Sequence, residues 1–180
     1  MATTIRFTLF SAKEIEKARQ QLIEYQDDLN EKLDLFVKKL CEKGVEIAKE
    51  KVSVYDAIDT GELLNSINLR EGDIIKNGSQ WFIYTDCKHA KYIEFGTGVV
   101  GENNPYPTDI PMEWNYASGT HIFTTKDGRV GWRYFKDGSW HFTEGQPSKP
   151  FLYETATELR EQILEVAKEV FGGASDDISD

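Results

Sequence analysis

Cysteine is scarce in this chain, and so are long apolar runs. Its 180 residues include only two cysteines, Cys41 and Cys87. A disulfide framework would need more, so we expect two reduced thiols in a protein made in the cytosol. The sequence opens without a charged-then-apolar leader, and no apolar run approaches the length of a membrane span. We therefore expect a soluble protein that is not exported through a cleaved signal.

Basic residues are also in short supply. There are 21 lysines and arginines against 31 acidic residues, which gives a net charge of −10. Such a surface repels phosphate, and this argues against a reader of nucleic acid. An acidic wall would still suit a channel through which DNA slides without sticking. Aromatic residues make up 12% of the chain, which favours a folded core over general disorder.

Proline is absent between residues 12 and 52, where apolar residues recur at spacings of three, four and seven. This pattern predicts a helix of roughly 60 Å, with Gly44 as a point where it bends or breaks. Residues 1–10 read as a preceding strand or arm, and Ser11 with Glu14 forms a capping box. A helix this long exceeds what one small core covers. We expect a strut that is partly buried against a neighbouring subunit.

The middle of the chain predicts short elements around glycine. A short helix follows Gly61, capped by Asp59 or Thr60, and a hairpin turns at Asn77-Gly78. Residues 90–98 predict a compact helical turn that ends in a Gly-Thr-Gly corner. A phosphate-binding loop is excluded there, because no Gly-Lys-Ser/Thr follows and no strand-then-helix order surrounds it.

After residue 98 the helical pattern is lost. Three prolines predict a loop over residues 99–119, which we interpret as an arm or lid that orders against a partner. Two Lys-Asp-Gly turns then predict a three-stranded meander with more aromatic rings than so small a sheet can hide. A final helix is expected over residues 150–171, followed by a disordered acidic tail at 174–180.

Together these patterns predict one α+β domain over residues 1–173, with residues 99–145 as an inserted loop and β-meander. In this fold the long N-terminal helix and the C-terminal helix pack on an antiparallel sheet.

Residues that could carry chemistry form no convincing catalytic constellation. Cys87 and His89 offer two metal ligands, but the sequence shows no matching second pair. His121 and His141 lie on predicted strands that might bring them face to face, although packed or solvent-exposed histidines are the simpler interpretation. Glu113 beside Trp114 has the composition of a raised-pKa acid, as in glycoside hydrolases, and any acidic protein supplies such pairs by chance. We predict no enzyme activity, no cofactor and no metal.

Three segments, taken in order, resemble the tail-completion or neck proteins of long-tailed phages and prophages. They are residues 60–67, 92–97 and 146–152, which look like a Thr-Gly-x-Leu-x-x-Ser block, a Tyr-Val-x-Phe-Gly-Thr block and a Gln-Pro-x-x-Pro-Phe-Leu block followed by a helix. The likeness covers about residues 30–171. This sequence departs from the family in its N-terminal strand, its longer first helix and its Pro-rich loop with meander.

The resemblance implies a non-enzymatic subunit of a ring at the head–tail junction, found in the virion and in the host cytoplasm before assembly. Six-fold or twelve-fold rings are expected, with connector, tail-terminator or tail-tube proteins as neighbours, DNA only passing through the lumen, and no membrane. The residues expected to form the family motifs or the subunit interface are Thr60, Gly61, Leu63, Ser66, Tyr92, Phe95, Gly96, Thr97, Trp132, Trp140, Pro150 and Phe151.

Three other functions stay open at this point. The nearest is a tail terminator or collar that caps the tube of a contractile tail or a phage-tail-like particle. The second is a cell-wall hydrolase that uses Glu113 or a histidine. The third is an acidic inhibitor that mimics nucleic acid, which the aromatic hairpins make less attractive.

Overall fold

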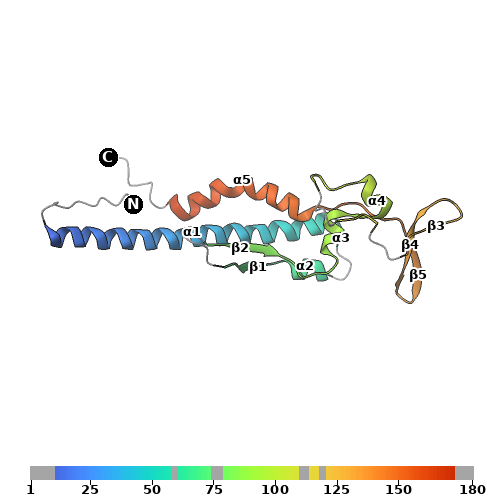
Figure 1. Cartoon of the computed structure of the whole chain (residues 1–180), viewed down its shortest axis with the longest axis horizontal. Coiled ribbons are helices and arrows are strands. Elements are labelled where there is room, and N and C mark those ends of the chain that lie inside the picture. The colour runs from blue at the N-terminus through green and yellow to red at the C-terminus, as the bar shows by residue number, and fades with distance from the viewer. Residues whose placement is uncertain (1–10, 58–60, 74–78, 110–113, 118–120, 173–180) are drawn as a thin grey trace. The chain divides into compact units, whose positions relative to one another are not determined.

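The computed structural model describes residues 11–57, 61–73, 79–109, 114–117 and 121–172 (Figure 1). The elements in chain order are α1 (Ala12–Val54), α2 (Glu62–Ser66), β1 (Asn68–Glu71), β2 (Trp81–Tyr84), α3 (Ala90–Phe95), α4 (Gly98–Asn103), β3 (Phe123–Thr124), β4 (Val130–Lys136), β5 (Ser139–Thr143), β6 (Gly145–Gln146) and α5 (Phe151–Phe171). β1 pairs with β2, and β3, β4 and β5 form an antiparallel meander in that order. The predicted α+β class, with a long N-terminal helix, a C-terminal helix and small antiparallel sheets, is confirmed.

Some predictions fall on residues that the structure does not describe. Among them are the strand or arm at residues 1–10, the Asn77-Gly78 turn and the acidic tail. Among the described helices, none has both the length and the apolar character that a membrane span requires.

Internal contacts divide the chain into two compact units. The first comprises Met1–Glu46, Leu69–Ile83 and Thr157–Asp180, and the second comprises Ile47–Asn68 and Tyr84–Ala156. Both α1 and α5 contribute residues to each unit. The two units are therefore described in turn.

In the first unit, α1 begins where the sequence predicts. The Glu14 N–H donates to Ser11 Oγ at 3.3 Å, which is the first half of the capping box. The helix continues unbroken through Gly44, so the expected break is wrong. A Cβ on Gly44 would lie 2.3 Å from Ile83 Cδ1 and 2.7 Å from Leu159 Cδ1. Glycine at this position lets β2 and α5 approach the helix surface closely.

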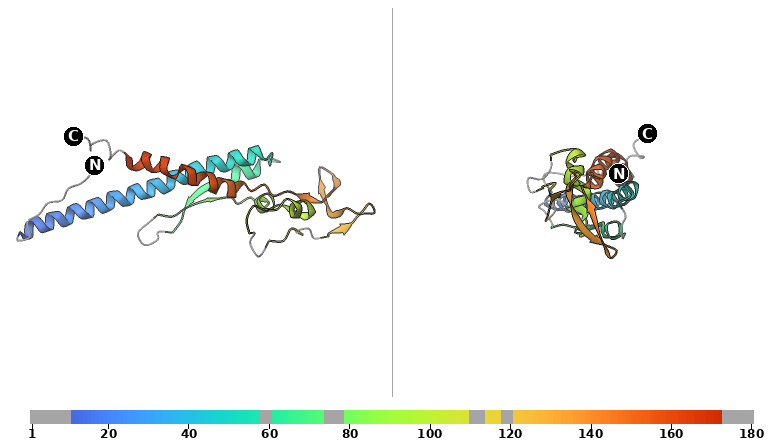
Figure 2. Two further views of the ribbon diagram at one scale, coloured as in Figure 1. Left: turned by 90° about the horizontal axis from the view of Figure 1, so that it is seen from above. Right: turned by 90° about the vertical axis from the view of Figure 1, so that its right-hand side faces the viewer.

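Within this unit α5 lies along α1 and runs in the opposite direction (Figures 1 and 2). The rings of Phe36 and Phe171 are 5.8 Å apart. An ion pair joins Lys39, which lies about one turn after Phe36 in α1, to Glu169, which precedes Phe171 in α5. α5 ends at Phe171, so Phe36 marks the point from which it covers α1.

β2 contacts α1 through a tryptophan. Trp81 Nε1 donates to Asp34 Oδ1 at 2.9 Å, and the Lys38 ammonium lies over the indole ring at 5.5 Å. Hydrogen bonds from Ser79 and then Trp81 lower the pKa of Asp34. The contact fixes β2 on the helix because the indole N–H and the carboxylate satisfy each other.

In the second unit, the meander forms as predicted. Asp137 and Gly138 have φ of 50° and 78°, which suits a tight hairpin turn and explains the Asp-Gly signal. β4 lies between β3 and β5. His141 therefore faces Tyr134 on β4, with the two rings stacked at 5.4 Å, so the alternative in which it faces His121 is wrong. Both histidines are exposed, in agreement with the simpler interpretation.

The expected loop over residues 99–119 is wrong in its first part, because Gly98–Asn103 form α4. Glycine makes this short helix possible. A Cβ on Gly101 would lie 2.9 Å from the backbone carbon of Gly96, so only glycine lets α4 pack this closely. The later described residues of the loop fold back on the same unit, and Tyr106 and Trp114 both contact Phe95. These two side chains are engaged within the unit itself.

Candidate functional site

Two of the three motif segments lie side by side in the second unit. Segment 92–97 covers α3 and its C-terminal corner, and segment 146–152 leads into α5. Several hydrogen bonds join them, and three of these end on a backbone carbonyl of α3: Gln146 Nε2 to Tyr92 O at 2.9 Å, Lys149 N to Ile93 O at 2.8 Å, and Ser148 Oγ to Glu94 O at 2.6 Å. The carbonyls at the end of a short helix lack partners within it. Tyr92 O also accepts the Gly96 N–H at 3.0 Å, and the second motif supplies donors to the Ile93 and Glu94 carbonyls at this end of α3.

Gly96 makes this close approach possible. Its φ of 77° and ψ of 170° lie in a region that is essentially restricted to glycine. A Cβ there would lie 2.6 Å from Ser148 N and 2.9 Å from Pro147 C, which are backbone atoms. Thr97 then pairs with Gln146 in an antiparallel bridge. The glycine in the motif is required by both conformation and space.

Glu94 is the polar centre of this junction. Its side chain is 4% exposed, and its two carboxylate oxygens accept the N–H groups of Leu152 at 2.9 Å and Tyr153 at 3.0 Å. These are first-turn donors of α5, which have no partner within a helix. Burial raises the pKa of Glu94, and this effect outweighs the hydrogen bonds from the two amides and from Tyr106. A distant carboxylate thus caps α5.

Sequence reasoning did not assign this role to Glu94. The sequence contained two signs of this role. Glu94 is an acidic residue between the apolar residues of one motif, and another motif leads into a helix whose first N–H groups need an acceptor. No local spacing connects the two, because the capping residue and its helix are more than fifty positions apart.

An aromatic cluster surrounds the same junction. The ring of Phe95 lies 4.9 Å from Tyr106 and 5.2 Å from Trp114, and Tyr92 lies 5.6 Å from Trp114. Burial, together with the nearby charge of Glu94, raises the pKa of Tyr106 to about 12. Tyr92 and Phe95 therefore support the interior of this unit.

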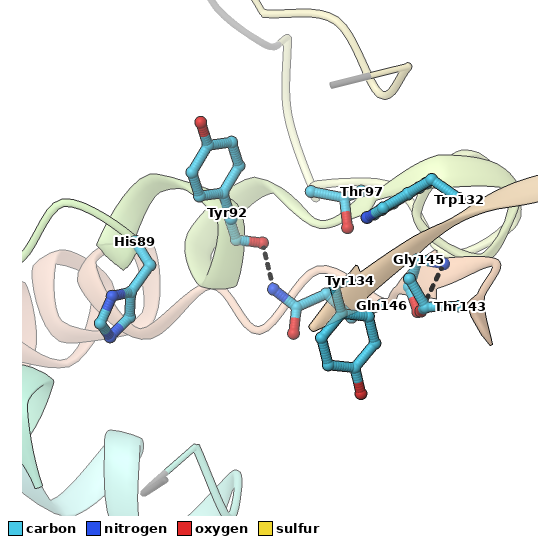
Figure 3. A pocket seen from close by; sticks show the side chains of 8 residues that line it. All are labelled: His89, Tyr92, Thr97, Trp132, Tyr134, Thr143, Gly145 and Gln146. Carbon is cyan, nitrogen blue, oxygen red and sulfur yellow. Dashed lines mark hydrogen bonds between the residues drawn. The ribbon is translucent and has the colours of Figure 1, made fainter. Parts of the chain in front are cut away.

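A pocket of about 490 Å³ opens beside the junction (Figure 3). It brings together Tyr92, Thr97 and Trp132 from the predicted set, and adds His89, Tyr134, Thr143, Gly145 and Gln146. The Gln146 amide reaches across to the Tyr92 carbonyl. Among the described residues that line it there is no carboxylate, so the pocket offers aromatic faces and neutral polar groups and no carboxylate pair for acid–base chemistry.

The other predicted site residues are spread over the unit. Gly61 holds a φ of 76° at the start of α2, without a side-chain cap, and Leu63 is buried. Ser66 Oγ shares a 2.6 Å hydrogen bond with Thr85 Oγ1. Phe151 is fully buried and Pro150 is buried before it, whereas Trp140 is 68% exposed on the meander. Asp59, Thr60 and the candidate acid Glu113 lie outside the described residues.

Comparison with known proteins adds no relative: no family model, curated protein or solved structure matches this chain.

Proposed function

We propose that this protein is a structural component of the phage neck, which forms a ring that completes the tail and joins it to the head. The observation that carries the proposal is the exposure of large apolar side chains in two separate places, on α1 and on the meander. Large exposed apolar patches on a soluble protein mark surfaces that meet other proteins.

The first place is a stripe along α1, which we call the α1 stripe. It consists of Ile15, Leu22, Tyr25, Leu29 and Leu33, which are between 36% and 57% exposed. At 3.6 residues per turn these positions fall on one face of the helix. Ile15, Leu22 and Leu29 are seven residues apart, as in helices that pack along a partner.

The α1 stripe continues towards Phe36, and there α5 begins to cover it. Phe36 contacts Phe171 at the end of α5, whereas Leu33 and Leu29 are exposed. The same helix face is thus half-buried at Phe36 and mostly open from Leu33 towards Ile15, where Ala18 is buried and the residues of the α1 stripe are exposed. We infer that a neighbouring copy of this chain covers the open end, as α5 does further along.

The second place is the tip of the meander. Phe135 and Trp140 stand opposite each other on β4 and β5, with rings 5.5 Å apart, and are 61% and 68% exposed. A three-stranded sheet of this size has no second layer in which to bury them. This edge-to-face pair is suited to entering an apolar surface on another chain.

Two unlike patches on one chain fit a ring. A contact between the α1 stripe of one copy and the meander of the next is heterologous, and such contacts close into rings when the rotation permits. The net charge of −10 suits a lumen that DNA traverses. In this proposal both long helices pack on the β1–β2 sheet, residues 99–145 form an insertion, and the ring is six-fold or twelve-fold.

The way in which the segments that resemble the family motifs pack together supports the same proposal. Two of the three motifs meet at Gly96 and Glu94, where they fix the start of α5. This packing gives the second unit, which carries the meander, a fixed core from which its exposed rings project.

Incorporation into particles tests the proposal. A Leu22→Glu/Leu29→Glu variant, produced in place of the wild-type chain, should leave particles with unjoined heads and tails. The matched control is Gln20→Glu/Asn30→Glu, which adds the same charge to exposed α1 positions outside the stripe. Normal assembly with the stripe variant would contradict the proposal, provided that circular dichroism shows both variants folded.

A further inference from the structure

Three potential metal ligands meet in the second unit, next to the pocket that His89 lines. One carboxylate oxygen of Glu62, the Sγ of Cys87 and one imidazole nitrogen of His89 all lie within 4.8 Å of one another. Glu62 is the first residue of α2, and the other two residues belong to the segment between β2 and α3. The sequence shows Cys87 and His89 as a pair, and the fold supplies the third donor.

The backbone holds both parts of this group in place. The Cys87 N–H donates to Thr85 Oγ1 at 3.1 Å, and Thr85 Oγ1 in turn shares its hydrogen bond with Ser66 at the end of α2. The Cys87 carbonyl accepts the Ala90 N–H at 3.1 Å as α3 begins. These bonds tie α2 to the segment that carries Cys87 and His89, and they do so without any metal.

The donor types favour one class of ion. Thiolate, imidazole and carboxylate are each ligands that zinc accepts, whereas calcium and magnesium prefer oxygen ligands alone. Bond lengths of about 2.0–2.3 Å around a tetrahedral zinc place its ligands roughly 3.5 Å apart. Small side-chain rotations from a separation of at most 4.8 Å reach this distance. Cys87 is 6% exposed, so its sulfur is shielded, while the Glu62 side chain is open to solvent.

We propose that Glu62, Cys87 and His89 bind one Zn²⁺ ion, with water as the fourth ligand. The ion connects α2 to the start of α3 and stabilises the unit that contains the motif junction. This site is independent of the proposed ring.

Cobalt spectroscopy of the full chain tests the site. The reduced protein, freed of metal with a chelator, is titrated with Co²⁺ and then with Zn²⁺. We expect one equivalent of tetrahedral cobalt with a sulfur-to-cobalt charge-transfer band, which Zn²⁺ abolishes. At zinc concentrations about a hundredfold above Kd, Tm should rise by about 5–10 °C.

The two cysteines provide a matched pair of variants. Cys41→Ser should keep the charge-transfer band, and Cys87→Ser should lose it. Glu62→Gln should weaken zinc binding by at least about tenfold, since even outer-shell partners of metal ligands have effects of that size. If Cys87→Ser does not fold, His89→Ala and Glu62→Gln decide by the same titration. A wild-type chain without the band, a band that survives Cys87→Ser, or unchanged affinity in the other two variants would overturn the proposal.

Discussion

Replacing Gly96 by alanine should disrupt the junction of the two motifs. The backbone of Gly96, at φ 77° and ψ 170°, lies where a residue with a Cβ is strained by about 1–3 kcal/mol. The new Cβ would also lie 2.6 Å from Ser148 N. That atom is part of the backbone, so relief requires the whole segment 146–152 to move away from α3.

Such a movement lengthens the hydrogen bonds that join the two segments. Each contributes about 0.5–1.5 kcal/mol, so losing two of them adds about 1–3 kcal/mol to the strain. We therefore expect Gly96→Ala to lower the free energy of unfolding of the second unit by about 2–6 kcal/mol. This is a large part of the 5–15 kcal/mol that is typical of a domain.

Gly138→Ala is the matched control. Gly138 has almost the same φ, 78°, but a Cβ there meets nothing within 4 Å. It should cost only the conformational strain, about 1–2 kcal/mol. Urea unfolding, with hydrogen exchange at the Leu152 and Tyr153 amides, measures both variants. Equal losses in the two variants, or unchanged exchange at these amides in Gly96→Ala, would refute the reasoning.

Three further predictions concern buried or paired groups. The raised pKa of Glu94 means that the stability of the wild-type protein relative to Glu94→Gln falls as pH rises from 4.5 through the folded-state pKa. Urea unfolding at several pH values should show this slope. In the control variant Glu102→Gln, the stability should depend on pH as it does in the wild-type protein. The lowered pKa of Asp34 means that Asp34→Asn should cost about 1 kcal/mol at pH 7, and that the difference should vanish as pH falls through the folded-state pKa, below 3.8. Gly44→Ala should cost about 1 kcal/mol net in thermal unfolding, because overpacking against Ile83 Cδ1 exceeds the gain in helix propensity, and adding Ile83→Val should recover part of the loss.

Local patterns predicted most of the elements. The apolar spacing of α1, the Lys-Asp-Gly turns of the meander and the glycine that ends α3 each act over a few residues, so the sequence displays them directly. Gly44 shows where this reasoning fails. Its low helix propensity suggests a break, but its neighbours β2 and α5, which approach only in the fold, require a small residue.

The candidate sites depend on contacts between distant segments, and those were not visible. The capping role of Glu94 and the meeting of Glu62 with Cys87 both join parts of the chain that no spacing rule connects. Thr97 and Trp132 were selected for different reasons, yet they line one pocket. α4 was missed because a glycine-rich stretch followed by prolines resembles a loop until packing is known.

Electron cryo-microscopy of assembled phage or phage-tail-like particles that contain this chain tests the central claim most directly. We predict a closed ring of copies between head and tail, in which the α1 stripe of each copy contacts the meander of the next. A map that places the chain elsewhere, or that shows Leu22, Leu29 and Trp140 facing solvent in the assembled particle, would contradict the proposal.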